Sequence, residues 1–105
     1  MSDELQVSRL VDLVSYQAGA IVSRIVLKRD AGSVTLFAFD AGQELSEHTT
    51  PYDALVQVVD GEAAITVAGQ SYRVATGETI LMPARQPHAL QAISRFKMLL
   101  TMIRS

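Results

Sequence analysis

The sequence contains no cysteine, no long apolar run and no excess of charge of one sign. Without cysteine, disulfide bonds, thiolate metal sites and cysteine nucleophiles are excluded. No stretch approaches the roughly 18 apolar residues of a membrane-spanning helix. Asp3 and Glu4 stand where a signal peptide would carry basic residues. We therefore expect a cytoplasmic protein with no membrane partner.

The formal net charge is only −2, so nothing in the electrostatics suggests a nucleic-acid partner. Hydrophobic residues make up 49% of the chain and charged residues 19%, which is enough apolar material for a real core. At 105 residues the chain has the usual size of one domain. We expect a single domain over residues 1–105, with an N-terminal segment of about residues 1–19.

Glycines divide the chain into short runs rich in β-branched and aromatic residues, which is typical of strands joined by turns. Asp30-Ala31-Gly32, Asp60-Gly61 and Ala68-Gly69 read as hairpin turns. Six or more short strands without a convincing interior helix predict an all-β sandwich or barrel. Residues 4–14 fit a short helix or a strand equally well. The expected strands are 21–27, 34–39, 55–59, 63–67, 72–74, 80–82 and 96–103.

The last expected strand is apolar on both faces. Phe96, Met98 and Leu100 alternate with Leu99 and Ile103, which predicts burial on both sides. The second cover is either another copy of the chain or the N-terminal segment. We favour a homodimer through this sheet, with Leu99 and Ile103 facing outward.

The chain has two histidines, and the residues around them resemble two long family motifs. Residues 42–61 run from Gly42 through His48, Thr50 and Ala54 to Gly61, as in the first motif of the cupins. Residues 77–92 run from Gly77 through Pro83 and His88 to Ala92, as in the second motif. Both spacings fit, so the chain resembles a small single-domain cupin of type 2 (RmlC-like) over about residues 20–103.

This resemblance implies a double-stranded β-helix, the cupin jelly-roll barrel, in which His48 and His88 meet in one cavity. Metal-binding cupins place three histidines and a glutamate at the four inward positions. Here Thr50 stands for the second histidine and Ala54 for the glutamate, and Arg85 replaces the glycine that follows the proline. By strand alternation, Thr50 is expected to face the same side as His48.

Two imidazoles without a carboxylate suit Mn or Fe poorly. We therefore expect no tightly bound cofactor, and at most a weakly bound Zn, Ni or Cu on His48 and His88. The sequence favours a module that binds a small organic ligand. The alternatives are a metal-dependent oxygenase or isomerase with a two-histidine centre, and a metal-free enzyme with a histidine general base. The expected cavity residues are His48, Thr50, Tyr52, Ala54, Met82, Arg85 and His88.

Overall fold

The computed structural model describes residues 6–104, and this part of the chain consists almost entirely of β-strands. The one helical element in it is a short 3-10 turn, η2, at Leu10–Asp12. The strands are β1 (Ile21–Arg29), β2 (Gly32–Phe39), β3 (Glu44–His48), β4 (Tyr52–Asp60), β5 (Glu62–Val67), β6 (Gln70–Ala75), β7 (Thr79–Met82), β8 (His88–Ala92) and β9 (Phe96–Arg104).

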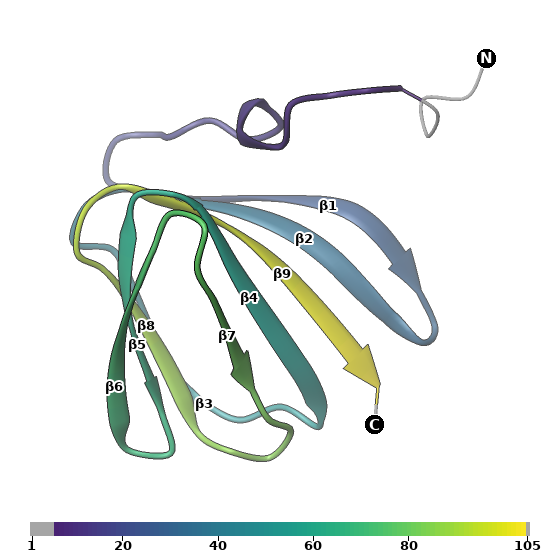
Figure 1. Cartoon of the computed structure of the whole chain (residues 1–105), viewed down its shortest axis with the longest axis vertical. Helices are drawn as coiled ribbons and strands as arrows, with labels where there is room; N and C mark the ends of the chain where they lie inside the picture. Colours follow the sequence, from purple (N-terminus) through teal and green to yellow (C-terminus); the bar gives the residue numbers. More distant parts are fainter. Residues whose placement is uncertain (1–5, 105) are drawn as a thin grey trace.

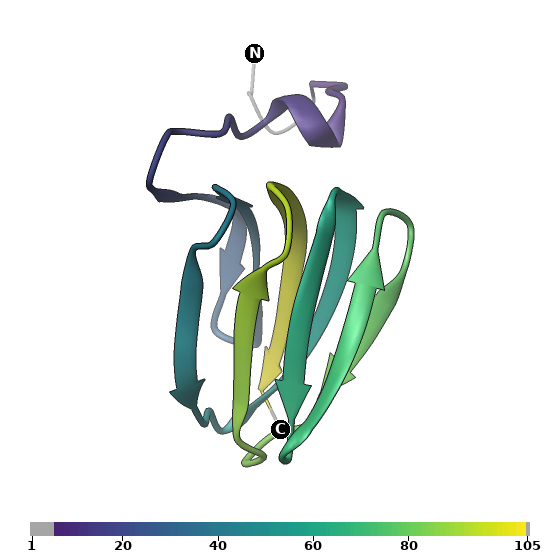
Figure 2. The ribbon, with the colours of Figure 1, turned by 90° about the vertical axis from the view of Figure 1, so that its left-hand side faces the viewer.

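Two antiparallel sheets face each other (Figures 1 and 2). One has five strands in the order β1-β2-β9-β4-β7, and the other has four in the order β3-β8-β5-β6. Apart from the hairpins β1-β2 and β5-β6, neighbouring strands in each sheet are distant in sequence, which is the jelly-roll arrangement. The expected all-β fold is therefore confirmed. The N-terminal segment crosses one end of the barrel, and the β3–β4 and β7–β8 loops lie at the opposite end (Figure 1).

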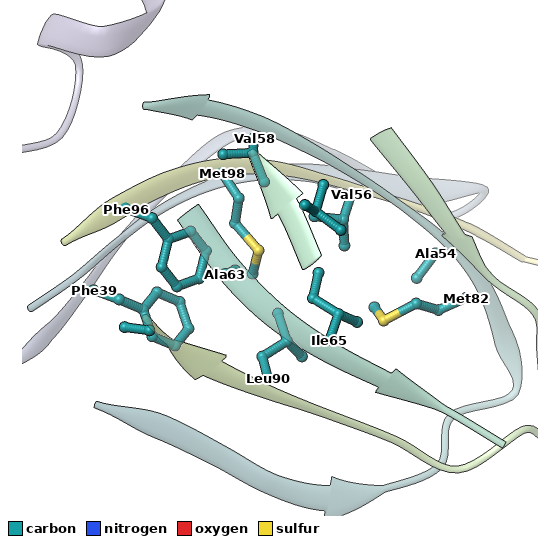
Figure 3. Packing of buried hydrophobic residues seen from close by; sticks show 12 residues of the cluster. Phe39, Ala54, Val56, Val58, Ala63, Ile65, Met82, Leu90, Phe96 and Met98 are labelled. Atoms are coloured by element: carbon teal, nitrogen blue, oxygen red, sulfur yellow. The ribbon is translucent and has the colours of Figure 1, made fainter. Parts of the chain in front are cut away.

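Alternation along the strands fills the space between the sheets with apolar side chains (Figure 3). In β9, Phe96 and Met98 are fully buried, as the sequence pattern predicts. The rings of Phe39 and Phe96 stack with centroids 4.5 Å apart. Truncating either ring to Ala is expected to cost about 3–5 kcal/mol. This packing fills much of the interior, so polar chemistry is left to the ends of the barrel.

One of the three expected hairpins is wrong. Asp60-Gly61 does not join paired strands, because β4 pairs with β7 and β9 while β5 pairs with β6 and β8. Gly61 instead turns the chain from one sheet into the other at a φ of +82°. A Cβ there would lie 1.9 Å from the Arg95 carbonyl oxygen, so the site requires glycine because the backbones approach closely.

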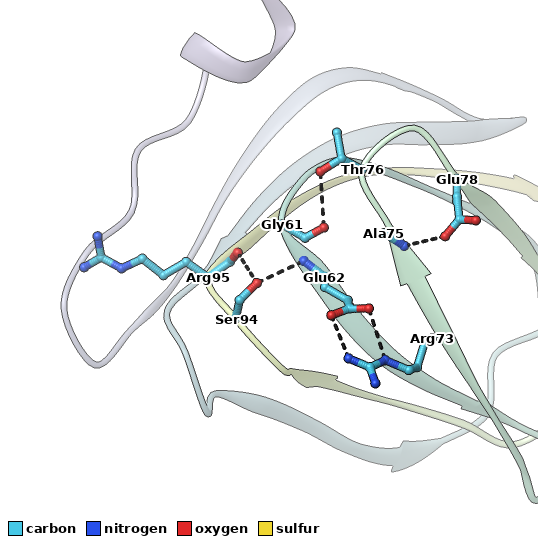
Figure 4. A network of polar contacts seen from close by, with 8 residues as sticks. All are labelled: Gly61, Glu62, Arg73, Ala75, Thr76, Glu78, Ser94 and Arg95. Carbon is cyan, nitrogen blue, oxygen red and sulfur yellow. Dashed lines mark hydrogen bonds and ion pairs between the residues drawn. The ribbon is translucent and has the colours of Figure 1, made fainter.

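Polar side chains hold this corner together (Figure 4). The Glu62 amide donates to Ser94 Oγ, which in turn donates to the Arg95 carbonyl. Arg73 forms a two-pronged ion pair with the Glu62 carboxylate, at 2.8 and 3.1 Å. These contacts link the start of β5 to β6 and to the β8–β9 turn, and they close this end of the barrel.

The N-terminal segment covers part of the outer face of the five-stranded sheet. Val14 is buried against Leu36 and Ala38 of β2, and Leu99 of β9 packs against the same cluster. The Tyr16 hydroxyl donates to the Asp60 carboxylate at 2.6 Å, which fastens the segment to the end of β4. Leu99 is thus partly covered by its own chain, whereas Ile103 stays exposed. Between residues 6 and 104, no helix has the length and apolar character needed to cross a membrane.

Candidate functional site

The two histidines touch at the open end of the barrel. His48 ends β3 and His88 begins β8, and they are register partners across the β3–β8 ladder. Their Nε2 atoms are 3.1 Å apart and their rings meet edge to face. His88 is buried, while His48 is exposed to solvent. The pair therefore has one ring fixed in the protein and one ring that a ligand can reach.

An irregularity in β3 turns His48 toward His88. Leu45 pairs with Leu90 and His48 with His88, so three steps along β3 match two steps along β8. Leu45 packs against the core, and three regular strand steps would turn His48 to the opposite face. The extra residue is a β-bulge that restores the inward direction. Bulges commonly re-aim a side chain beside a functional site.

Each imidazole is also held from behind by a backbone carbonyl. His48 Nδ1 lies 2.8 Å from the Ser46 carbonyl oxygen, and His88 Nδ1 lies 3.3 Å from the Gln86 carbonyl oxygen. With the contact between the two Nε2 atoms, the pair makes three contacts that each need a proton. Two neutral imidazoles carry two protons. The pair is thus one proton short of a hydrogen bond at every contact. A metal cation bound by the two Nε2 atoms would take the place of that proton.

Burial disfavours the protonated form of His88. Desolvation lowers the pKa of His88, and the neighbouring His48 charge lowers it further. The Gln86 carbonyl opposes this shift only in part. Burial therefore favours a neutral His88, whose Nε2 can accept a hydrogen bond from the exposed side of the pair.

Three of the expected cavity residues do not offer metal ligands. The Thr50 hydroxyl donates to the Tyr52 carbonyl and accepts from the Tyr52 amide, and β3 ends before Thr50, so the alternation assumed for it does not apply. Ala54 and Met82 are cross-strand partners in the apolar core. Within residues 6–104, no group of three or more His, Cys, Asp or Glu side chains is arranged to hold a metal. The four-ligand centre of metal-binding cupins does not fit this donor set.

Arg85 lies in the β7–β8 loop at the same end of the barrel. Its amide donates to the Thr50 carbonyl at 2.8 Å, which joins this loop to the one that follows His48. Its φ is +67°, the left-handed region that the glycine of the family motif would adopt without strain. The ion pairs within the described part of the chain are Arg73–Glu62 and Arg95–Asp40, so the exposed Arg85 guanidinium is not neutralised by a carboxylate.

Tyr52, the remaining expected residue, lies apart from the histidine pair. Tyr52 lines a small cavity of about 130 Å³ with Lys28, Ser33 and Met102. A larger cleft of about 460 Å³ lies between the edge strands β6 and β7, with Val67, Ile80 and Pro83 among its walls. Val67 is the cross-strand partner of His88. This cleft begins one strand away from His88, and Tyr52 lines a different cavity. The periodicity of the sequence gives no signal for this cleft, because the cleft lies where the edge strands of the two sheets remain apart.

A family model described as the cupin domain matches residues 35–104. Among curated proteins, the uncharacterized protein SCO3923 of Streptomyces coelicolor is 40% identical over 62 residues, which is 59% of each chain. The matched part therefore spans less than two thirds of that relative.

Two solved structures resemble the whole fold. The conserved protein SPY1581 of unknown function from Streptococcus pyogenes is 40% identical and superposes with a TM-score of 0.92, covering 96% of this chain and 89% of that one. The cupin superfamily protein DSY2733 from Desulfitobacterium hafniense is 28% identical with a TM-score of 0.90, covering 97% and 96%.

Proposed function

This chain belongs to the cupin family, and we propose that it binds a small organic acid at the His48–His88 pair. The observation that carries the proposal is the 3.1 Å contact between two Nε2 atoms whose Nδ1 partners are both backbone carbonyls. A carboxylate taken up together with one proton supplies what this arrangement lacks. The proton completes the third hydrogen bond, and the carboxylate lies beside the exposed His48.

The surroundings support an acid over a neutral ligand. Arg85 lies at the same rim without a carboxylate partner among the described residues, and a guanidinium holds a carboxylate through two parallel hydrogen bonds. A left-handed backbone at a residue other than glycine costs about 1–2 kcal/mol. Such strain is commonly kept at binding sites. The cleft beside Val67 has Arg73 and Glu78 among its walls, and its apolar wall of Val67, Ile80 and Pro83 would take the hydrocarbon part of the ligand.

A matched ligand panel tests this function. Small monocarboxylic acids and their primary amides are compared by thermal shift and calorimetry on the wild-type chain. The acids should raise the melting temperature and the amides should not. His48→Gln keeps a polar side chain of similar reach but cannot accept the proton, and it should abolish the difference between acid and amide. Ser71→Ala, an exposed change on β6, serves as the control variant.

A labile divalent cation is the second candidate occupant, since a metal-bound histidine usually donates its other N–H to a carbonyl or carboxylate. Both histidines here have that arrangement. The cation would be Zn, Ni or Cu, because Mn and Fe(II) favour oxygen ligands that the site does not offer. Elemental analysis with a zinc titration separates the two candidates. Tight stoichiometric metal that blocks acid binding would favour the cation, and acid binding to chelator-treated protein would favour the proposal above.

A further inference from the structure

The inner face of the five-stranded sheet becomes polar beside the β1–β2 hairpin. Met102 of β9 packs against the core, and its cross-strand partner on β2 is Ser33. Ser33 is in turn the partner of Lys28 on β1. Side chains of cross-strand partners lie on the same face of a sheet, so Lys28 and Ser33 face inward with Met102.

Two further polar side chains lie on this face, at the same end of the sheet. On β4, Tyr52 stands two residues before the buried Ala54. On β9, Arg104 stands two residues after Met102 and is the cross-strand partner of Tyr52. Because positions two apart in a strand share a face, both side chains point inward. We call these four polar residues the inner rim: Lys28, Ser33, Tyr52 and Arg104.

The inner rim borders a cavity that is separate from the histidine pair. Lys28, Ser33 and Tyr52 line this cavity of about 130 Å³, and Arg29 and Asp30 of the hairpin line it as well. One water occupies roughly 30 Å³ in the liquid, whereas pockets for whole organic ligands measure about 300 Å³ or more. The cavity therefore suits a small polyatomic ion or one polar group of a larger molecule.

Positive charge dominates around this cavity, although the whole chain has a net charge of −2. The three cations Lys28, Arg29 and Arg104 are accompanied by a single carboxylate, that of Asp30. Both ion pairs within residues 6–104 involve other side chains. The surroundings of the cavity thus carry an excess of two positive charges that no salt bridge in this part of the chain neutralises.

The polar groups around the cavity also have hydrogen-bond donors to spare. Arg29 and Arg104 each donate one guanidinium N–H to a backbone carbonyl of the hairpin, at 2.8 and 3.4 Å. A guanidinium carries five N–H donors. The hydroxyls of Ser33 and Tyr52 make no hydrogen bond within the described residues. Donors from β1, β2, β4 and β9 are therefore available for an acceptor with several oxygens.

We propose that this cavity is a second binding site, which takes a phosphate dianion. A phosphate group carries close to two negative charges at neutral pH and has three strong acceptor oxygens, which matches both the excess charge and the spare donors. Lysine and arginine both bind phosphate, the first as a point charge and the second through paired N–H groups. Phosphomonoesters and inorganic phosphate share this chemistry.

Protection of a sheet edge explains only part of this cluster. Basic side chains on an edge strand keep it from pairing with another chain, and β1 is such an edge. Arg104 and Tyr52, however, lie on β9 and β4, which are inner strands with a neighbour on each side. Edge protection does not require a cation and a hydroxyl at these two positions, whereas an anion site does.

Calorimetric titration of the full chain with phenyl phosphate and with inorganic phosphate gives the first test. Each should bind at one site per chain at pH 7.5, and each should displace the other. Lys28→Gln and Tyr52→Phe should each weaken binding roughly ten-fold, because each removes a hydrogen bond to a charged group. Arg9→Gln is the matched control, since it removes one positive charge from an exposed position in the N-terminal segment. It should leave the affinity unchanged.

The order of the two affinities identifies the source of the group. Tighter binding of phenyl phosphate assigns the site to a phosphomonoester, and tighter binding of inorganic phosphate assigns it to the free ion. His48→Gln should leave both affinities unchanged, because His48 lies in the other sheet. Loss of phosphate binding in His48→Gln would place the ion at the histidine pair and overturn this proposal.

Backbone amide chemical shifts provide a second test that needs no variant. Inorganic phosphate should cause saturable shifts at Lys28, Ser33 and Tyr52 and leave the amide of His88 unshifted. No saturable shift at millimolar phosphate, or equal shifts at exposed cations such as Arg9, would overturn the proposal. The basic residues of the hairpin would then serve only to protect the β1 edge.

Discussion

The Nε2 atom of His88 lies 3.1 Å from the Nε2 atom of His48, although forty residues separate the two in sequence. The contact depends on one extra residue in β3 that directs His48 inward. It joins a buried ring of lowered pKa to an exposed ring at the open end of the barrel. This relationship underlies the proposed binding of an acid.

The pKa shift of His88 gives the stability a pH dependence with a defined sign. The folded pKa lies below its ordinary value of 6.5, so below that pH the unfolded chain binds a proton that folded His88 resists. Stability should therefore fall as the pH is lowered through 6.5 toward 5. Chemical denaturation at several pH values measures this slope. The His88→Gln variant should show a shallower slope, and an unchanged slope would assign the effect to other groups.

Replacing Arg85 by Gly should stabilise the fold while weakening acid binding. The change relieves the left-handed strain at φ +67° but adds backbone freedom to the unfolded chain. The net gain should be about 0.5–1 kcal/mol. Arg85→Lys keeps both the strain and the charge and should show no gain. A less stable Arg85→Gly chain would mean that the arginine side chain contributes contacts that outweigh the strain.

Gly61 and Gly77 form a matched pair, because both have positive φ but only Gly61 is crowded. A Cβ at Gly61 would meet Arg95 and Phe96 backbone atoms within 3 Å, whereas at Gly77 nothing lies within 4 Å. Gly61→Ala should cost more than about 3 kcal/mol, and Gly77→Ala only about 1–2 kcal/mol. Thermal unfolding of both variants makes the comparison. Equal losses would show that φ alone, and not backbone crowding, sets the requirement at residue 61.

Much of the fold could be predicted from the sequence because alternation and turn residues are local signals. The inward set of β9, from Phe96 to Met98, and the hairpins before Gly32 and around Ala68-Gly69 are of this kind. The corner at Asp60-Gly61 was wrongly predicted as a hairpin, because a positive φ is compatible with a hairpin and with a sheet-to-sheet corner equally well. Only the tertiary approach of Arg95 distinguishes them.

The site shows the same limit. The spacing of the two motifs predicts that His48 and His88 meet, because the resemblance implies a barrel that brings both motifs to one cavity. It does not predict the bulge before His48 or the turn that occupies the Thr50 hydroxyl, because both depend on local backbone geometry. The cover of Leu99 by Val14 and Tyr16 depends on the path of the N-terminal segment, for which the sequence left helix and strand open.

Proton uptake measured by calorimetry tests the central proposal most directly. At pH 7.5 a small carboxylic acid is ionised in solution, so completing the third hydrogen bond of the histidine pair requires one proton from the buffer. Titrations in two buffers of different ionisation enthalpy should give an uptake of about one proton per bound acid. His48→Gln should abolish this uptake. Acid binding without any proton uptake, or equal binding by His48→Gln, would contradict the account.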